Sequence, residues 1–172
     1  MLVEAANGGD VAAFEALYHR YRDWVVRLAY RFTGDRDDAL DVMQDAFAYL
    51  LGKFPGFTLS ARMTTFLYPV VKNLSIAAGR KKRRFLSDDQ ALSEAVARPP
   101  PGGNAVREEL ASALSALPEA QREVLLMRFV DDMSLEEIAL ALEIPVGTVK
   151  SRLHYALRLL REDKRTRDYF QA

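Results

Sequence analysis

The chain has 172 residues, of which 49% are hydrophobic and 28% charged, a composition that suits one medium domain or two small ones rather than general disorder. It has no cysteine, which excludes disulfides, thiolate metal sites and cysteine nucleophiles. There is no run of about 18 apolar residues and no signal-peptide pattern, so we expect a cytoplasmic protein without membrane insertion.

Charge is distributed unevenly along the chain although it sums to zero. The 24 basic and 24 acidic residues balance, yet residues 59–84 contain seven basic side chains and no acidic one. Five of the seven are consecutive, at residues 80–84. Such a stretch can bind a polyanion, and an equally open alternative is a solvated basic helix end.

Apolar residues at intervals of three or four predict two amphipathic helices in the first third of the chain. The first helix carries Phe14, Leu17, Tyr21, Val25, Leu28 and Phe32 on one face. Thr33 and Gly34 end it, and Asp35 or Asp37 can cap the next helix. The apolar face of that second helix is predicted to contain Leu40, Met43, Phe47, Leu50 and Leu51. Gly52 fits the position just past its end.

A third helix is predicted to begin near Thr65 and to continue into the basic stretch. If Thr65 is the N-cap, Pro69 falls in the first turn or just beyond it, so we expect a late start or a kink. Helical spacing is lost after residue 84, and the prolines and glycines of residues 99–103 cannot continue a helix. We therefore expect a flexible linker over residues 85–105 between two helical domains.

The second domain is predicted to begin with two helices separated by Pro118. Leu110, Leu114 and Leu117 belong to the first of these helices. The second is expected to turn Val124, Leu125 and Phe129 inward.

A helix-turn-helix is predicted from residue 134 onward. Ser134 and Glu137 form a capping box, which begins a short helix with Ile138, Ala139 and Leu142 buried. A turn follows at residues 143–145, and a second helix runs from Val146 to about Glu162. Four apolar side chains would keep that helix docked on the first: Val149, Leu153, Ala156 and Leu160.

The outer face of this last helix is polar and basic. It carries Thr148, Lys150, Ser151, Arg152, His154, Tyr155, Arg158 and Arg161, whereas residues 131–143 contain five acids and no base. This reversal of charge is typical of a recognition helix that enters the major groove of DNA. The alternative is an ordinary helical hairpin with a solvated charged face.

Three strings make the chain similar to the extracytoplasmic-function (ECF) group of RNA polymerase sigma factors: LPEAQREV at 117–124, SLEEIA at 134–139 and PVGTVKSRL at 145–153. Residues 35–51 and 66–84 resemble the family's regions 2.2 to 2.4. The resemblance implies an all-α fold with region 2 at residues 1–84, a linker at 85–105 and region 4 at 106–172. It further implies a transcription initiation factor that recognises the −35 and −10 promoter elements and helps to melt the latter.

The resemblance also implies partners and contact residues. Region 2 would bind the β′ clamp helices of core RNA polymerase, and the complete chain would also contact the β flap, promoter DNA and an anti-sigma factor. The implied polymerase contacts are Asp41, Gln44, Asp45 and Ala48. The implied −10 contacts are Phe57, Arg62, Thr64, Thr65, Phe66, Lys72, Asn73, Arg80, Lys81, Arg83 and Arg84, with residues 57–64 as a specificity loop. The implied −35 contacts are Thr148, Lys150, Ser151, Arg152, His154, Tyr155 and Arg158.

The chain departs from the family pattern at four positions. The family often has tryptophan where Phe66 stands and a basic residue where Pro69 stands. Tyr155 and Leu157 likewise occupy positions that are often basic. These departures bear on promoter specificity rather than on membership of the family.

No residue pattern indicates an enzyme, a metal or a cofactor. The two histidines, His19 and His154, are far apart in sequence and neither has a metal-ligand spacing around it. Two other functions remain open at this point: a DNA-binding regulator of another kind, with an N-terminal sensing or dimerisation domain, and an adaptor that binds only proteins.

Overall fold

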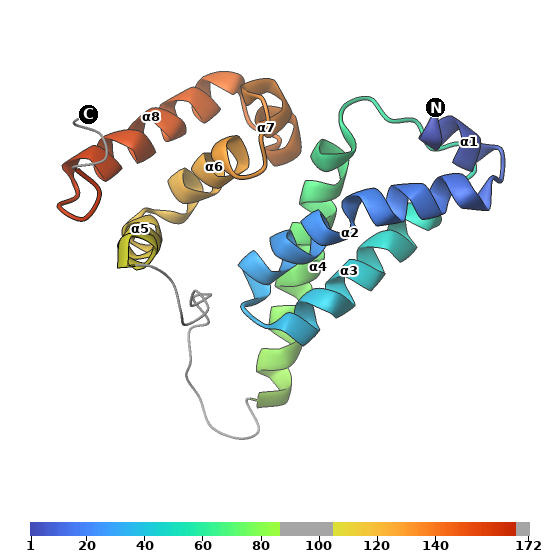
Figure 1. Ribbon diagram of the computed structural model, residues 1–172, viewed down its shortest axis with the longest axis horizontal. Helices are drawn as coiled ribbons and strands as arrows, with labels where there is room; N and C mark the ends of the chain where they lie inside the picture. The colour runs from blue at the N-terminus through green and yellow to red at the C-terminus, as the bar shows by residue number, and fades with distance from the viewer. Residues whose placement is uncertain (87–104, 168–172) are drawn as a thin grey trace. The chain divides into compact units, whose positions relative to one another are not determined.

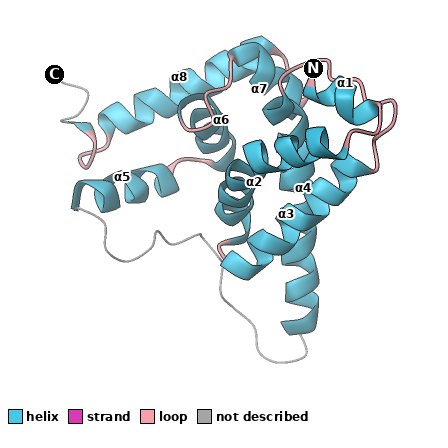
Figure 2. Ribbon diagram, turned by 45° about the vertical axis from the view of Figure 1, so that its right-hand side comes forward, coloured by secondary structure: helices cyan, strands magenta, loops and turns pink. Residues whose placement is uncertain are grey.

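The computed structural model describes the backbone of residues 1–86 and 105–167 and the side chains of residues 1–83 and 108–167. Within these residues the chain forms α-helices and no strand, which confirms the predicted all-α fold (Figure 2). It divides into two compact units, Met1–Ala97 and Arg98–Ala172, called here unit one and unit two. Most of the predicted linker, residues 87–104, lies outside the described residues.

Unit one contains α1 (Leu2–Asn7), α2 (Val11–Thr33), α3 (Arg36–Leu51) and α4 (Met63–Leu86). The helices α2, α3 and α4 pack against one another pairwise, and α1 packs on α2 (Figure 1). Large fully buried side chains from all three long helices fill the centre: Val25, Leu28, Val42, Leu50, Leu67, Tyr68 and Val71.

Aspartates cap the N-termini of α2 and α3, and for α3 the sequence predicts this. The Asp10 carboxylate accepts hydrogen bonds from the backbone N–H groups of Ala12 and Ala13 at the start of α2. The Asp35 carboxylate caps α3 in the same way. Between these two helices Gly34 has φ 68°, a left-handed conformation that glycine adopts without strain, so α2 ends there and the chain reverses.

The buried face of α3 differs from the predicted one. Leu40 and Leu51 are 37% and 53% exposed, so their assignment to the core is wrong. The core face is narrower and consists of Ala39, Val42, Met43, Ala46, Phe47 and Leu50. Three small or β-branched residues in this set let α3 approach α2 and α4 closely, which leaves the two outer leucines in solvent.

The helix α4 begins at Met63, two residues before the predicted start, and continues past Pro69. The prediction that Pro69 would delay the helix is therefore wrong. A proline here removes one backbone donor. The neighbouring side chains of Leu67, Tyr68 and Val71 are almost completely buried, and this packing offsets the unfavourable helix propensity.

Unit two contains α5 (Ala105–Ala116), α6 (Glu119–Phe129), α7 (Leu135–Leu142) and α8 (Val146–Glu162). One core joins α5, α6 and α8 through Ala113, Leu117, Leu125, Ala156 and Leu160. Leu117 lies in the turn before α6 rather than inside α5. The prediction that Phe129 faces inward is wrong, because its side chain is 64% exposed at the end of α6.

Candidate nucleic-acid and protein interfaces

The helix-turn-helix of unit two forms with the predicted bounds. The backbone N–H of Glu137 donates to the Ser134 hydroxyl over 3.1 Å, and the Ser134 N–H donates to the Glu137 carboxylate over 2.8 Å. Glu143 then adopts φ 54°, which ends α7 and turns the chain toward Pro145 and the start of α8. The local sequence therefore determines where this motif begins and turns.

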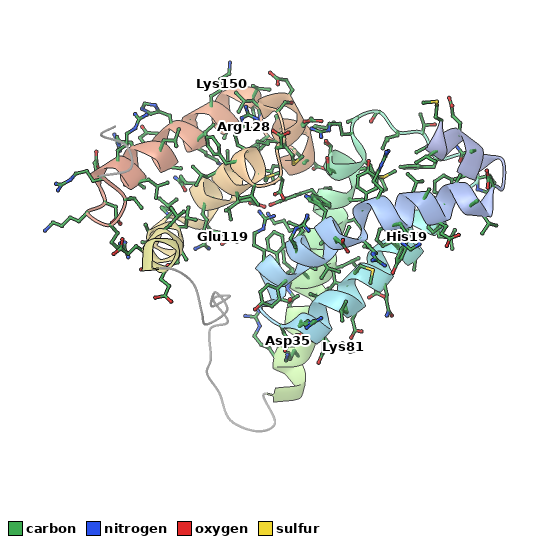
Figure 3. All side chains as sticks on the ribbon, viewed as in Figure 1. His19, Asp35, Lys81, Glu119, Arg128 and Lys150 are labelled. Atoms are coloured by element: carbon green, nitrogen blue, oxygen red, sulfur yellow. The ribbon has the colours of Figure 1, made fainter. Side chains whose placement is uncertain are left out.

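The outer face of α8 presents five of the seven predicted −35 contacts to solvent: Lys150, Ser151, His154, Tyr155 and Arg158. Their spacing of three and four residues lines them along one side of the helix, opposite the buried Val149, Ala156 and Leu160. Thr148 and Arg152 are partly buried on the flank of this face. In Figure 3 Lys150 stands on the outer side of α8.

Four of these groups already have partners within α8: Ser151, His154, Tyr155 and Arg158. The guanidinium of Arg158 lies 4.8 Å from the centre of the Tyr155 ring and 3.9 Å from a Glu162 oxygen. The Ser151 hydroxyl donates to the Thr148 carbonyl over 3.0 Å. Lys150 has no such interaction among the described residues, so its ammonium is available to an anion without loss of an internal contact.

The basic end of α4 is the second positive surface, and it belongs to unit one. This helix contains six basic residues and no acidic one. Arg80, Lys81 and Arg83 are exposed, whereas the side chain of Arg84 lies outside the described residues.

Lys82 differs from its neighbours because it is tied to the start of α3. Its ammonium lies 2.8 Å from an Asp38 oxygen and 3.3 Å from an Asp35 oxygen. Hydrogen bonds to the two carboxylates, Asp38 first, raise the pKa of Lys82, while backbone and Lys82 hydrogen bonds lower the pKa of Asp35. Figure 3 shows Asp35, at the start of α3, and Lys81, near the end of α4, close to the same end of these two helices.

The predicted −10 contacts on the first half of α4 and the preceding loop differ in how exposed their side chains are. Arg62 and Asn73 are exposed, and Thr64, Phe66 and Lys72 are partly buried. Phe57 and Thr65 are only 8% and 3% exposed. The Phe57 ring packs 4.8 Å from Phe66 and 5.4 Å from Phe54, centre to centre. Phe57 and Thr65 are therefore buried in this structure, and their assignment as −10 contacts stays a prediction.

The outer face of α3 combines acidic and apolar side chains. Asp41, Gln44, Asp45 and Ala48 are all exposed at helical spacing. Leu40 and Leu51, which the sequence placed in the core, border the same face. A helix face with carboxylates flanked by exposed leucines is suited to a protein partner rather than to DNA.

The described residues contain no group of three or more histidine, aspartate or glutamate side chains arranged to hold a metal ion. His19 lies 3.6 Å from Glu15 on the surface of α2. None of the helices in the described part of the chain is long and apolar enough to span a bilayer.

Two family patterns match the chain, one in each unit. Sigma-70 region 2 matches residues 17–85, and Sigma-70, region 4 matches residues 107–160. The first spans α2 to α4 and the second spans α5 to α8, so the two matches follow the two structural units.

Curated relatives match over almost the whole length. The ECF RNA polymerase sigma factor SigW of Bacillus subtilis is 30% identical over 95% of each chain. The ECF RNA polymerase sigma-E factor of Escherichia coli is 32% identical, over 91% of this chain and 88% of the relative. The RNA polymerase sigma-H factor of Pseudomonas aeruginosa is 33% identical over 90% and 88%, respectively.

Two solved structures share the fold. The sigma factor RpoE in its complex with the anti-sigma factor NepR from Bartonella quintana has a TM-score of 0.68, with 23% identity over 88% of this chain and 96% of that one. CnrH in complex with the cytosolic domain of CnrY has a TM-score of 0.66, also at 23% identity, over 92% and 91%.

A helical region 2 unit followed by a region 4 helix-turn-helix defines a sigma factor, a class of initiation factors that is not known to be enzymatic. The chain belongs to its ECF group. It directs RNA polymerase to promoters. The two alternative functions, a stand-alone DNA-binding regulator and an adaptor that binds only proteins, are therefore not favoured.

Proposed function

We propose that the two units divide promoter recognition, with unit one acting on the −10 element and unit two on the −35 element. The observation that carries this division is that each unit has its own exposed basic surface, at the end of α4 and along α8. Spacer DNA separates the two elements, so a protein with two linked DNA-binding surfaces can hold both at once. Each contact raises the effective concentration of the other.

In unit two, α8 enters the major groove of duplex DNA. Lys150, Ser151 and His154 are exposed toward the N-terminal half of this helix, the part that reaches base edges in helix-turn-helix proteins. The Arg152 guanidinium can donate two hydrogen bonds at once, as a bidentate contact with guanine O6 and N7 requires. Arg158, which lies over Tyr155, contacts a phosphate nearer the C-terminal end.

In unit one, α4 holds DNA that is being opened. Arg80, Lys81 and Arg83 bind phosphates, which gives affinity without reading sequence. Asn73 is exposed about two to three turns before them on the same helix and offers an amide to an unpaired base. Melting is then favoured because an extruded base gains contacts that a paired base lacks.

The outer face of α3 docks on core RNA polymerase through Asp41, Gln44, Asp45 and Ala48. Support comes from the exposure of all four side chains and of Leu40 and Leu51 beside them. The acidic groups favour a basic polymerase surface, and the leucines provide the apolar area that such interfaces bury.

An anti-sigma factor is a further proposed partner of this chain. The RpoE structure that shares this fold contains one. A partner that covered the exposed apolar and acidic side chains of α3 would block polymerase docking directly. Its binding would be detected as competition with core polymerase for the purified chain.

A mobility-shift experiment tests the proposed function. The purified chain is mixed with promoter DNA, obtained by sequencing the transcripts that it directs, with and without core polymerase. We expect weak binding by the chain alone and tight, sequence-selective binding with core, because contacts to two elements are productive only on the enzyme. Strong binding of the free chain to a palindromic site would instead indicate a dimeric regulator.

A further inference from the structure

The loop between α3 and α4 alternates buried and exposed side chains. Phe57 and Met63 are buried and Leu59 and Ala61 are partly buried. The residues between them, Thr58, Ser60 and Arg62, are all exposed. The loop thus presents three hydrogen-bonding side chains on one side, while its other side packs against the protein. Such side chains can read an unpaired base if the loop backbone is held in place.

Aromatic packing anchors only one side of this loop. The Phe57 ring lies between Phe54 and Phe66, and Phe54 packs edge-on against Phe14 of α2, with ring centres 5.9 Å apart. Ring packing is not directional enough to fix the backbone of a loop. The backbone after Gly56, which has φ 97°, is also held by hydrogen bonds.

Asn7, at the end of α1, is the partner in these hydrogen bonds. Its Oδ1 accepts hydrogen bonds from the N–H groups of Gly56 and Phe57 over 2.8 and 2.9 Å. Its Nδ2 donates to the Phe57 carbonyl over 2.8 Å. One partly buried amide side chain thus makes three hydrogen bonds to two consecutive residues, 49 and 50 positions away in sequence.

No other side chain of similar size can make the same set. Aspartate retains both accepted bonds but replaces the donor with an oxygen that repels the Phe57 carbonyl, and alanine loses all three. Asn7 also lies before residue 17, where the match to the family's region 2 begins, so that match does not assign it a role.

We propose that Asn7 is a positioning residue that holds the loop backbone at Gly56 and Phe57 so that Thr58, Ser60 and Arg62 face the opened −10 strand. The inference rests on the proposed function of unit one. It adds to that function the short helix α1, which carries Asn7 at its C-terminal end. Loss of the three bonds allows the loop several conformations, so that discrimination between −10 bases falls.

The test uses the full-length chain assembled with core polymerase. Rates of open-complex formation are measured on a promoter taken from its own transcripts and on versions with single substitutions in the −10 element. The readout is the ratio of the rates on the original and substituted promoters. A role limited to stability would lower both rates together and leave this ratio unchanged.

We expect Asn7→Ala to lower the ratio about fivefold, the equivalent of one net hydrogen bond, because only part of the effect of losing three bonds reaches base discrimination. Asn7→Asp should lie between the wild type and Asn7→Ala, because it retains two of the three bonds. Val11→Ala, at a 79% exposed position next to α1, is the matched control and should leave the ratio unchanged. An unchanged ratio for both Asn7 variants would overturn the inference.

A second variant separates this inference from the proposed function on which it rests. Thr58, Ser60 and Arg62 are replaced by alanine together. If this triple variant lowers the ratio and Asn7→Ala does not, the loop reads the DNA but Asn7 does not position it. If the triple variant leaves the ratio unchanged, the loop does not read the −10 element and the inference fails, whereas the proposed role of α4 at that element is tested separately by Asn73→Ala.

Discussion

The two surfaces proposed to bind DNA in this sigma factor are built in different ways. In unit two, the capping box, the turn and the recognition helix all lie within residues 134–162, so the surface depends on contacts between near neighbours. In unit one, segments far apart in sequence are tied together, Asn7 to Phe57 across 50 residues and Lys82 to Asp38 across 44. We infer that unit two reads rigid duplex DNA with a self-contained motif, whereas unit one holds its loop and helix in register to trap flexible, unpaired bases.

The largest expected effect tests whether unit one also carries the polymerase contact. We predict that Asp41→Arg lowers affinity for core polymerase about thirtyfold or more, because a like-charge contact in an interface costs several kcal/mol. The measurement is the dissociation constant of the complex with core. Asp23→Arg, the same reversal at an exposed residue of α2, is the control. Equal affinities for the wild type and Asp41→Arg would show that the docking face is not on α3.

The sequence was a sufficient guide to the helix-turn-helix of unit two but not to the outer face of α3. The capping box and the bounds of α8 were predicted correctly, because each is specified by residues at most four apart. Leu40 and Leu51 were misplaced because helical spacing gives the direction of the apolar face but not its width, which depends on how closely the neighbouring helices pack.

The environments of three residues in unit one could not be predicted from the sequence for a related reason. Phe57 was assigned to DNA by its place in the family's specificity loop, and its burial depends on rings contributed by Phe54 and Phe66. Asn7 gave no signal in the sequence, since an asparagine at a helix end is common and its partners are about 50 residues away. The helix was predicted to start near Thr65, with Thr65 as a possible N-cap, but α4 begins at Met63 and Thr65 lies inside it.

A smaller effect is expected from the two adjacent lysines of α4. We predict that Lys81→Ala weakens binding to all promoter sequences alike and flattens the dependence of log affinity on log salt by about 0.9, the value for one phosphate contact. Lys82→Ala should leave this slope unchanged, because Lys82 is engaged with Asp35 and Asp38. Both slopes are measured with the polymerase complex. Equal flattening by the two variants would mean that Lys82 leaves its carboxylates to bind DNA.

The smallest effect concerns acid stability at the end of unit two. Hydrogen bonds from Arg165 lower the pKa of Asp163 from 3.8 to about 2. Because the pKa of the folded state is lower, the stabilisation is complete above pH 3.8 and is lost as the pH falls toward about 2. We predict that Asp163→Asn lowers the thermal unfolding midpoint slightly at neutral pH, and that the difference disappears as the pH approaches 2.

Thermal unfolding followed by circular dichroism at a series of pH values measures this difference. Asp35→Asn is the matched variant in unit one, since asparagine can still cap α3 but no longer pairs with Lys82. A difference between Asp163→Asn and the wild type that stayed constant down to the lowest pH would show that the carboxylate charge does not stabilise this turn.

The division of labour between the two units is tested most directly by pairing protein variants with promoter variants. Open-complex formation is measured for Asn73→Ala and Arg152→Ala on promoters altered in the −10 or the −35 element, with Lys164→Ala as a control for loss of charge. We predict that Asn73→Ala slows opening more than it weakens polymerase binding and abolishes only the −10 preference. Arg152→Ala should reduce only the −35 preference, by about 1–3 kcal/mol. If either variant reduced both preferences equally, the two units would not act on separate elements and the account would be wrong.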